Sequence, residues 1–554
     1  MKNGFLSKSL DLLTRRQTNI LSAAFVIMVT VVLSQFLGLI RQRLLVGIFG
    51  ASDELGIYLY ATLLPDTLFQ LTIAAALASA FIPVFSDYLA RGKEKEAHKM
   101  ASTLLALGFS IFTVLSLLLA FFARDILQIF NLGANFSPQE MDLMANMMRI
   151  IIVGQLFFIV GTFFTALLQS YNHFFIPGIA AALYNLGIII GVLLFSDTFG
   201  IYSTTVGVLL GGLIFILVQI PLARKVGFRF QPSVAYLKSD GVKKIGKLMW
   251  PRTIAVVLFQ LGTVAIGSFI SLLADPGRMN VIFDYAKTLA FAPVALFGQT
   301  IAQAAFPVLS REKDKPEEFK STFINSFNQM LYLVLPVSVL ILILRIPFVR
   351  LVYGADKFDW PATVLTGQTL AFFSVSIFAQ ALITLVLRAF YALHDTKIPL
   401  FVGGLSTVLL IALSYVFIIV TDMGVVSLGI AFSIASIVQL IVLFLLLERK
   451  VGGFKKAPLL VSWSKFFISS FLTAFALYIP IKLLDQLVFD TTRTINLIIL
   501  TGISSLLGLA LYLFLTWFFD VKEAKAYVLM FQKIGNWKEI LKKSQELLGM
   551  GRMS

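Results

Sequence analysis

The stretch VIFDYAKTLAFAPVALFGQ, residues Val281–Gln299, has the length and apolar character of a helix that crosses a bilayer, apart from Asp284 and Lys287. An ionised side chain at mid-bilayer costs about 2.5–3.5 kcal/mol on insertion scales. Such residues therefore face a water-filled cavity or a partner rather than lipid. The stretch predicts a membrane-spanning helix with one side on a polar space.

The whole chain has the composition of an integral membrane protein. Of its 554 residues, 58% are hydrophobic and 13% are charged, and the mean hydropathy is +0.90, beyond what a soluble core absorbs. Apolar runs of about 20 residues predict an all-α membrane protein with about fourteen transmembrane helices. These runs begin near Asn19, Leu55, Met100, Met147, Phe175, Ile201, Lys247, Asn280, Thr322, Thr366, Pro399, Val425, Lys465 and Ile495.

The formal net charge of +16 is distributed unevenly between alternate connections. One set includes ARGKEKEAHK and SREKDKPEEFK and is basic, whereas the other includes ADPGRMN and TDMG and is neutral to acidic. Basic loops lie on the cytoplasmic side, so the pattern places both termini in the cytoplasm. We interpret the positive charge as a topology signal and an attraction to membrane lipids, and we expect no nucleic acid as a partner.

Two halves of the chain resemble each other. ASAFIPVFSDYLARGKEKE near Pro83 is similar to AQAAFPVLSREKDKPEE near Pro307, at a separation of 307 − 83 = 224 residues, and Pro177 and Pro399 lie in a second matched pair at 399 − 177 = 222. This repeat predicts two six-helix lobes related by a parallel pseudo-twofold axis. The predicted parts are an N-terminal lobe at 1–230, a C-terminal lobe at 231–450, two further helices at 451–520 and a cytoplasmic amphipathic tail at 521–554.

Several basic side chains fall inside or at the edge of predicted spans. Arg41 and Lys287 each lie more than a turn inside a helix, one in each predicted lobe. Cations from both lobes that faced a shared cavity would suit an anionic substrate, above all a phosphate. Arg43 and Arg252 are either cavity or interface residues, and Arg388 is interpreted as structural, at the cytoplasmic end of its helix.

Two carboxylates accompany these cations. Asp66 follows Pro65, where the helix should be kinked, and Asp284 lies one turn before Lys287, which it would neutralise in a purely structural pair. We treat Asp66 and Asp284 as candidate coupling carboxylates. Glycine motifs for nucleotide phosphates are missing from the sequence, so coupling to an ion gradient or the membrane potential is expected, without a cofactor or a metal.

Five segments together resemble the MurJ/MviN-type lipid II flippases of the multidrug/oligosaccharidyl-lipid/polysaccharide exporter superfamily. They are SQFLGLIRQRLLVGIFGAS, AFIPVFSDY, NHFFIPGIAAALYNLG, YAKTLAFAPVALFGQTIAQAAFPVLS and FYALHDTKIP. The resemblance implies two lobes around a cationic cavity, and a groove at 451–520 for a polyprenyl tail. The implied activity is movement of a polyprenyl-diphosphate-linked peptidoglycan precursor to the outer leaflet of the bacterial cytoplasmic membrane by alternating access, in support of cell-wall synthesis and cell shape.

The resemblance also points to individual positions. Arg41 matches one of the family's first-span arginines, whereas Gln35 occupies the other, and Lys287 lies beside the eighth-span arginine position. Gly56 stands where an aspartate is usual. The predicted substrate-binding residues are Arg41, Lys287, Arg43, Arg252 and Gln35.

Other functions stay open at this point. The sequence has no catalytic motif, and its three histidines fall in predicted loops, so we expect no enzyme. A flippase for another lipid-linked oligosaccharide is an alternative, as is a non-transporting scaffold that recruits cell-wall synthesis proteins. A drug or cation antiporter of the same superfamily would need acidic cavity residues, whereas the mid-helix charges here are mostly basic.

Overall fold

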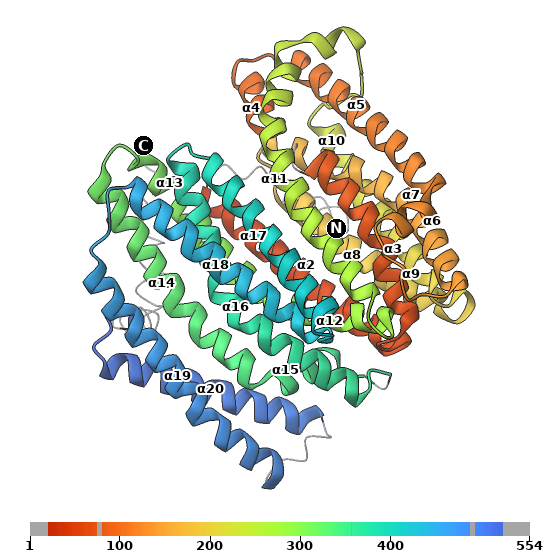
Figure 1. Ribbon diagram of the computed structural model, residues 1–554. Helices are drawn as coiled ribbons and strands as arrows, with labels where there is room; N and C mark the ends of the chain where they lie inside the picture. Colours follow the sequence, from red (N-terminus) through yellow and green to blue (C-terminus); the bar gives the residue numbers. More distant parts are fainter. Residues whose placement is uncertain (1–19, 75–79, 356, 488–493, 525–554) are drawn as a thin grey trace, which may run out of the picture. The chain divides into compact units, whose positions relative to one another are not determined.

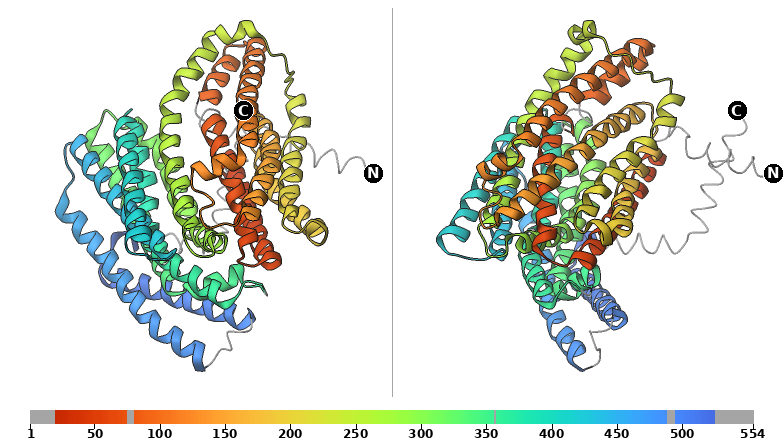
Figure 2. Two further views of the ribbon diagram at one scale, coloured as in Figure 1. Left: turned by 45° about the vertical axis from the view of Figure 1, so that its right-hand side comes forward. Right: turned by 90° about the vertical axis from the view of Figure 1, so that its right-hand side faces the viewer.

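A computed structural model describes residues 20–74, 80–355, 357–487 and 494–524, and every regular element in these ranges is a helix (Figures 1 and 2). Thirteen helices in the described ranges are long and apolar enough to cross a membrane. The predicted span near Leu55 is the shorter helix α3, which continues as the π-helix η1. Each of the fourteen predicted spans therefore has a helix in the structure, and the prediction of an all-α membrane protein is confirmed.

The helices at the predicted spans are α2 Ile20–Phe49, α3 Asp53–Phe69, α5 Glu94–Phe121, α7 Pro138–Ser170, α8 Phe175–Phe199, α9 Tyr202–Leu217, α11 Asp240–Ser271, α12 Pro276–Pro293, α14 Pro316–Ile343, α16 Trp360–Ala392, α17 Lys397–Tyr415, α18 Val426–Lys450, α19 Lys456–Leu487 and α20 Thr494–Phe518. The shorter elements are η1 Gln70–Ala74, α4 Ile82–Ala90, α6 Ala123–Ile129, α10 Ile220–Lys225, η3 Val234–Lys238, η4 Val294–Gln299, α13 Thr300–Arg311, α15 Arg345–Tyr353 and η5 Val416–Val420.

The chain forms two compact units, each assembled from several segments. Unit 1 contains Met1–Ala286, Val352–Thr369 and Gly403–Ala431, and unit 2 contains Lys287–Leu351, Leu370–Val402 and Phe432–Ser554. The predicted lobes stay predictions, as does the groove at 451–520. Most of the predicted amphipathic tail, residues 525–554, lies outside the described part of the chain.

Within unit 1, α8 and α9 pack so closely that glycine backbones touch. A Cβ on Gly187 would collide with the backbone of Gly211, and one on Gly191 would collide with Gly207. In each helix the two glycines are four residues apart and share a face. Lipid supplies no hydrophobic force between helices, so this close van der Waals fit holds the pair together.

Helices α3 and α12 are interrupted in the same way. Pro65 lies within α3, shortly before the π-helix η1, and Pro293 ends α12, directly before the π-helix η4. Proline lacks an N–H and clashes with the carbonyl one turn earlier. Inside a membrane, the freed backbone groups are satisfied by local π-helical adjustment.

The first turns of α3 and α12 lie against each other in unit 1. A Cβ on Gly56 would collide with the backbone of Gly277, so no side chain fits at this position. Asp53 Oδ1 accepts a hydrogen bond from the backbone N–H of Arg278 at 3.1 Å. Arg278 Nη2 in turn lies 2.8 Å from both carboxylate oxygens of Asp359, which precedes α16.

Candidate functional site

Arg41 lies on α2 and is half-buried. Its Nε is buried and has no hydrogen-bond partner among the described residues. A buried guanidinium N–H without an acceptor costs free energy. Arg41 therefore has one buried donor that no described residue satisfies.

Asp66 lies on α3 directly after Pro65, and its side chain is exposed although it sits within a predicted span. Gln155 of α7 donates a hydrogen bond from Nε2 to Asp66 Oδ1. The carbonyl oxygen of the same buried Gln155 has no hydrogen-bond partner among the described residues. The carboxylate of Asp66 is thus positioned by the side-chain amide of Gln155, and part of it is exposed.

Arg41, Asp66 and Asp284 belong to one electrostatic cluster in unit 1. The charges of Arg41 and Asp284 both act on Asp66, and all three act on Tyr58. The charges of Arg41 and Asp66 also act on Tyr184 of α8. The structure therefore brings one predicted substrate-binding cation together with both predicted coupling carboxylates.

Two tyrosines attach α2 to α12 and to the end of α15 within unit 1. The buried Tyr353 donates to Gln42 Oε1 at 2.9 Å, and Tyr285 donates to the Gln42 backbone carbonyl at 3.4 Å. The two tyrosine rings pack with their centroids 4.7 Å apart. Because Gln42 follows Arg41 and Tyr285 follows Asp284, these contacts fix the backbone beside both charged side chains.

The other predicted first-span residues are placed differently. Arg43 is exposed, and its Nη1 donates to the backbone carbonyl of Val352 at 3.2 Å. Gln35 is exposed on α2, six residues before Arg41. Six residues correspond to a rotation of about 240° in an α-helix, so Gln35 and Arg41 lie on different faces.

Lys287 is half-buried on α12 and belongs to unit 2, in which it forms no ion pair with another described residue. Arg252 lies in α11, and its side chain is outside the described part of the structure. Arg388 lies on α16 with its guanidinium carbon 5.4 Å from the centre of the Phe306 ring, a packed position that suits a structural role. The roles predicted for Lys287 and Arg252 stay predictions.

One histidine differs from its predicted loop position. His98 lies within α5, where its Nε2 is 2.7 Å from the hydroxyl of Tyr171, which donates to Glu94 at 2.8 Å. The basic residues around it made this segment look like a loop, but α5 begins at Glu94, before the apolar run starts. His98 is therefore part of a packed cluster rather than a solvated loop.

Sequence reasoning missed the neutral members of the charge cluster, Tyr58, Gln155 and Tyr184. A signal for Tyr58 was present, because Tyr58 and Asp66 are eight residues apart and share a helix face. Gln155 was also visible as a polar residue within the apolar segment IIIVGQLFFIVG. No local pattern marks Tyr184, because its place depends on the packing of α8.

The helices define a class, that of multi-pass all-helical membrane proteins. A solved structure of "Lipid II flippase MurJ, inward closed conformation" is similar with a TM-score of 0.74 and 23% sequence identity, over 90% of this chain and 99% of that one. An inward-facing multidrug resistance MATE family transporter of the MOP superfamily is similar with a TM-score of 0.63 and 15% identity, over 78% of this chain and 99% of that one.

The family described as "Lipid II flippase MurJ" matches residues 45–498. Lipid II flippase MurJ of Burkholderia cenocepacia is 25% identical over 79% of this chain and 84% of its own length. A probable lipid II flippase MurJ of Buchnera aphidicola subsp. Schizaphis graminum is 26% identical over 70% of this chain and 76% of its own length. This chain belongs to the MurJ lipid II flippase family.

Proposed function

We propose that this protein moves lipid II from the inner to the outer leaflet of the bacterial cytoplasmic membrane by alternating access, with both termini in the cytoplasm. The observation that carries the proposal is the family match over residues 45–498. The basic character of the loops assigned to the cytoplasm supports the orientation. The role in peptidoglycan synthesis follows from the family.

In this proposal Arg41 binds the diphosphate of the substrate. Its buried Nε lacks an acceptor among the described residues, and a diphosphate supplies several strong acceptor oxygens. Gln42 and its two tyrosine contacts hold the α2 backbone beside Arg41, which restricts where the guanidinium can point. Lys287, Arg43, Arg252 and Gln35 are further proposed substrate contacts.

Asp66 and Asp284 are the proposed coupling groups. With Arg41 they form a cluster of two carboxylates and one cation, so its formal charge is −1 when all three are ionised. A proton or a monovalent cation on Asp66 would neutralise the cluster, and the exposed side of this carboxylate gives access to it. Substrate release from Arg41 can then respond to the ion gradient or the membrane potential.

A depletion strain tests the proposal. Cells that depend on Arg41→Ala or Lys287→Ala protein should accumulate lipid II on the inner leaflet and lose its appearance outside, whereas Arg388→Ala should largely preserve transport because Arg388 packs on Phe306. Membrane abundance of each variant is measured in parallel. If the Arg41→Ala and the Lys287→Ala single variants both give normal outer-leaflet lipid II, the assignment of these two residues to substrate binding is refuted.

The same strain separates the alternative functions. A non-transporting scaffold would support growth without Arg41, because its contacts lie in cytoplasmic loops. Photo-crosslinking with lipid II and with other polyprenyl-diphosphate glycans identifies the transported head group. Preferential crosslinking of another glycan would overturn lipid II as the substrate while leaving the flippase class intact.

A further inference from the structure

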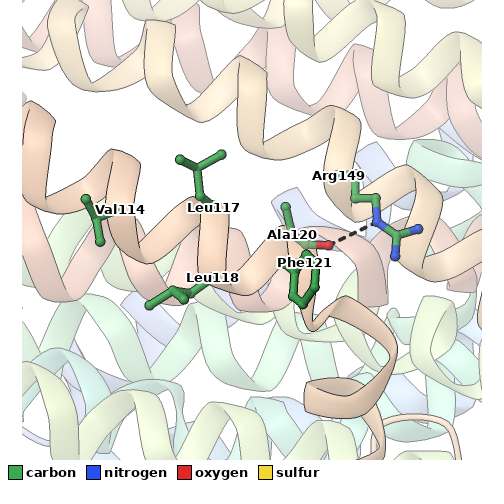
Figure 3. Close-up of a pocket in the computed structure, with 6 residues that line it drawn as sticks. All are labelled: Val114, Leu117, Leu118, Ala120, Phe121 and Arg149. Carbon is green, nitrogen blue, oxygen red and sulfur yellow. Dashed lines mark hydrogen bonds between the residues drawn. The ribbon is translucent and has the colours of Figure 1, made fainter.

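A groove on unit 1, away from the charge cluster, is formed by one side of α5 and a single side chain of α7. Its volume is about 760 Å³. The lining residues are five from the last two turns of α5 and one cation from α7, shown in Figure 3: Val114, Leu117, Leu118, Ala120, Phe121 and Arg149.

The α5 side of the groove faces the hydrocarbon of the membrane. Val114, Leu117 and Phe121 expose 58%, 64% and 78% of their surface, although α5 is one of the most apolar spans. Apolar side chains this exposed on a spanning helix contact acyl chains. The groove between these side chains and Arg149 is therefore accessible to an acyl chain of a membrane lipid.

Arg149 is held in place at one end of this groove. Its Nε donates to the backbone carbonyl of Ala120 at 3.0 Å (Figure 3). Its Nη1 donates to Asn146 Oδ1 at 2.7 Å. Both bonds leave Nη2 with free donors, and among the described residues no carboxylate pairs with this guanidinium. The positive charge of Arg149 is fixed but not neutralised.

Along this face of α7 the side chains change from polar to apolar, in the same order as the head group, phosphate and acyl chain of a lipid. Asp142, Asn146, Arg149 and Val153 recur every three or four residues and share one helix face. Asp142 forms an ion pair with Arg124 at 2.6 Å, and Val153 is 44% exposed. Along the helix, a charged pair is thus followed by a cation and then by hydrocarbon-facing residues.

We propose that this groove binds one anionic glycerophospholipid. The phosphodiester accepts hydrogen bonds from Arg149 Nη2, and one acyl chain lies along Leu117 and Val114. The glycerol head group extends toward Asn146 and the Arg124–Asp142 pair. Because Asp142 neutralises Arg124 whereas nothing described neutralises Arg149, the groove has a net positive charge and selects an anionic over a zwitterionic lipid.

Native mass spectrometry of the full-length protein, purified in detergent and titrated with phosphatidylglycerol or phosphatidylethanolamine, tests this site. Wild type should retain one phosphatidylglycerol more tightly than phosphatidylethanolamine. Arg149→Gln should weaken phosphatidylglycerol about tenfold, because charge-assisted hydrogen bonds are lost. Arg149→Lys keeps the charge and should retain most of the preference. Arg91→Gln is a matched control, since Arg91 is exposed and pairs with Asp87 elsewhere in unit 1.

Substitution of Arg149 also removes its hydrogen bond to Ala120 near the end of α5. A second variant tests the groove without this side effect. Leu117→Trp places a bulkier side chain in the path of the acyl chain and should weaken lipid retention while leaving Arg149 and its two hydrogen bonds unchanged. Unchanged phosphatidylglycerol retention in Arg149→Gln or in Leu117→Trp overturns the site. Equal retention of the two lipids by wild type overturns the selectivity for an anionic head group.

Discussion

Helices α3 and α12 have the same backbone construction but place their charges differently. Each contains a proline that is followed by a π-helical segment, and the prolines are 293 − 65 = 228 residues apart, close to the spacing of the sequence repeat. In α3 the carboxylate of Asp66 comes directly after the proline. In α12, Asp284 lies nine residues before Pro293, beside Tyr285.

This difference separates the role of the bend from the role of the charge. A π-helical segment does not follow every proline in a span, since Pro336 lies inside α14 without one, and η5 ends α17 with no proline nearby. The interruption by itself therefore marks no site. At Asp66 the carboxylate is at the bend, is exposed and is held by one amide of Gln155. At Asp284 the neighbouring backbone is instead fixed by the Tyr285 and Tyr353 contacts.

The contact between the first turns of α3 and α12 should give the largest effect on stability. Gly56→Ala places a Cβ into the backbone of Gly277, and because backbone cannot move aside cheaply we expect a loss of about 3 kcal/mol. Chemical unfolding in detergent measures it. Gly246→Ala is the control, since nothing lies within 4 Å of its added Cβ, and it should be neutral or slightly stabilising. Equal effects of the two substitutions would contradict the contact.

The bend of α3 can be tested at Asp66. Asp66→Ala leaves both polar ends of the buried Gln155 without partners and should cost about 1–3 kcal/mol. Asp66→Asn keeps an acceptor for the Gln155 amide and should cost less than about 1 kcal/mol. Thermal unfolding of the two variants ranks them. A loss in Asp66→Asn as large as in Asp66→Ala would show that the charge, rather than the hydrogen bond, stabilises this bend.

The start of α12 should be less sensitive. Arg278→Ala removes the contacts with both oxygens of Asp359, whose side chain is 48% exposed, so we expect a loss of about 0.5–1 kcal/mol. A double-mutant cycle with Asp359→Asn isolates the pair. A coupling energy indistinguishable from zero would mean that only the backbone bond between Asp53 and Arg278 joins these turns.

The smallest effect is a pH dependence from the same pair. Partial burial acts to raise the pKa of Asp359, but hydrogen bonds from Arg278 and from the backbone N–H of Ala362 lower this pKa overall. A carboxyl whose pKa is lowered by folding stabilises the protein above its unfolded pKa of about 3.9. That stabilisation, less than about 1 kcal/mol for an exposed pair, is lost as the pH falls through the folded pKa. The free energies of unfolding of wild type and Arg278→Ala, measured between pH 7 and pH 3, should converge at the acid end.

Thirteen of the fourteen spans could be predicted because their apolar runs are long enough to form helices that cross a membrane. The run near Leu55 forms the shorter helix α3, which continues as η1. Arg41, Asp66 and Asp284 could be singled out because a charge within such a run is costly. Their proximity could not be predicted, since it depends on how α2, α3 and α12 pack. The same holds for Gly56, where the resemblance indicated a missing aspartate and only the structure shows the backbone of Gly277 in its place.

The glycine contact between α8 and α9 bears on how the chain is assembled during synthesis. The two helices are joined by a short turn at Gly200, and the glycine surfaces that fit together belong to consecutive spans. They can therefore associate as soon as both have left the translocon, while the later spans are still on the ribosome. A bulky residue at Gly191 or Gly207 should be visible as early degradation of the nascent protein, before any assay of transport.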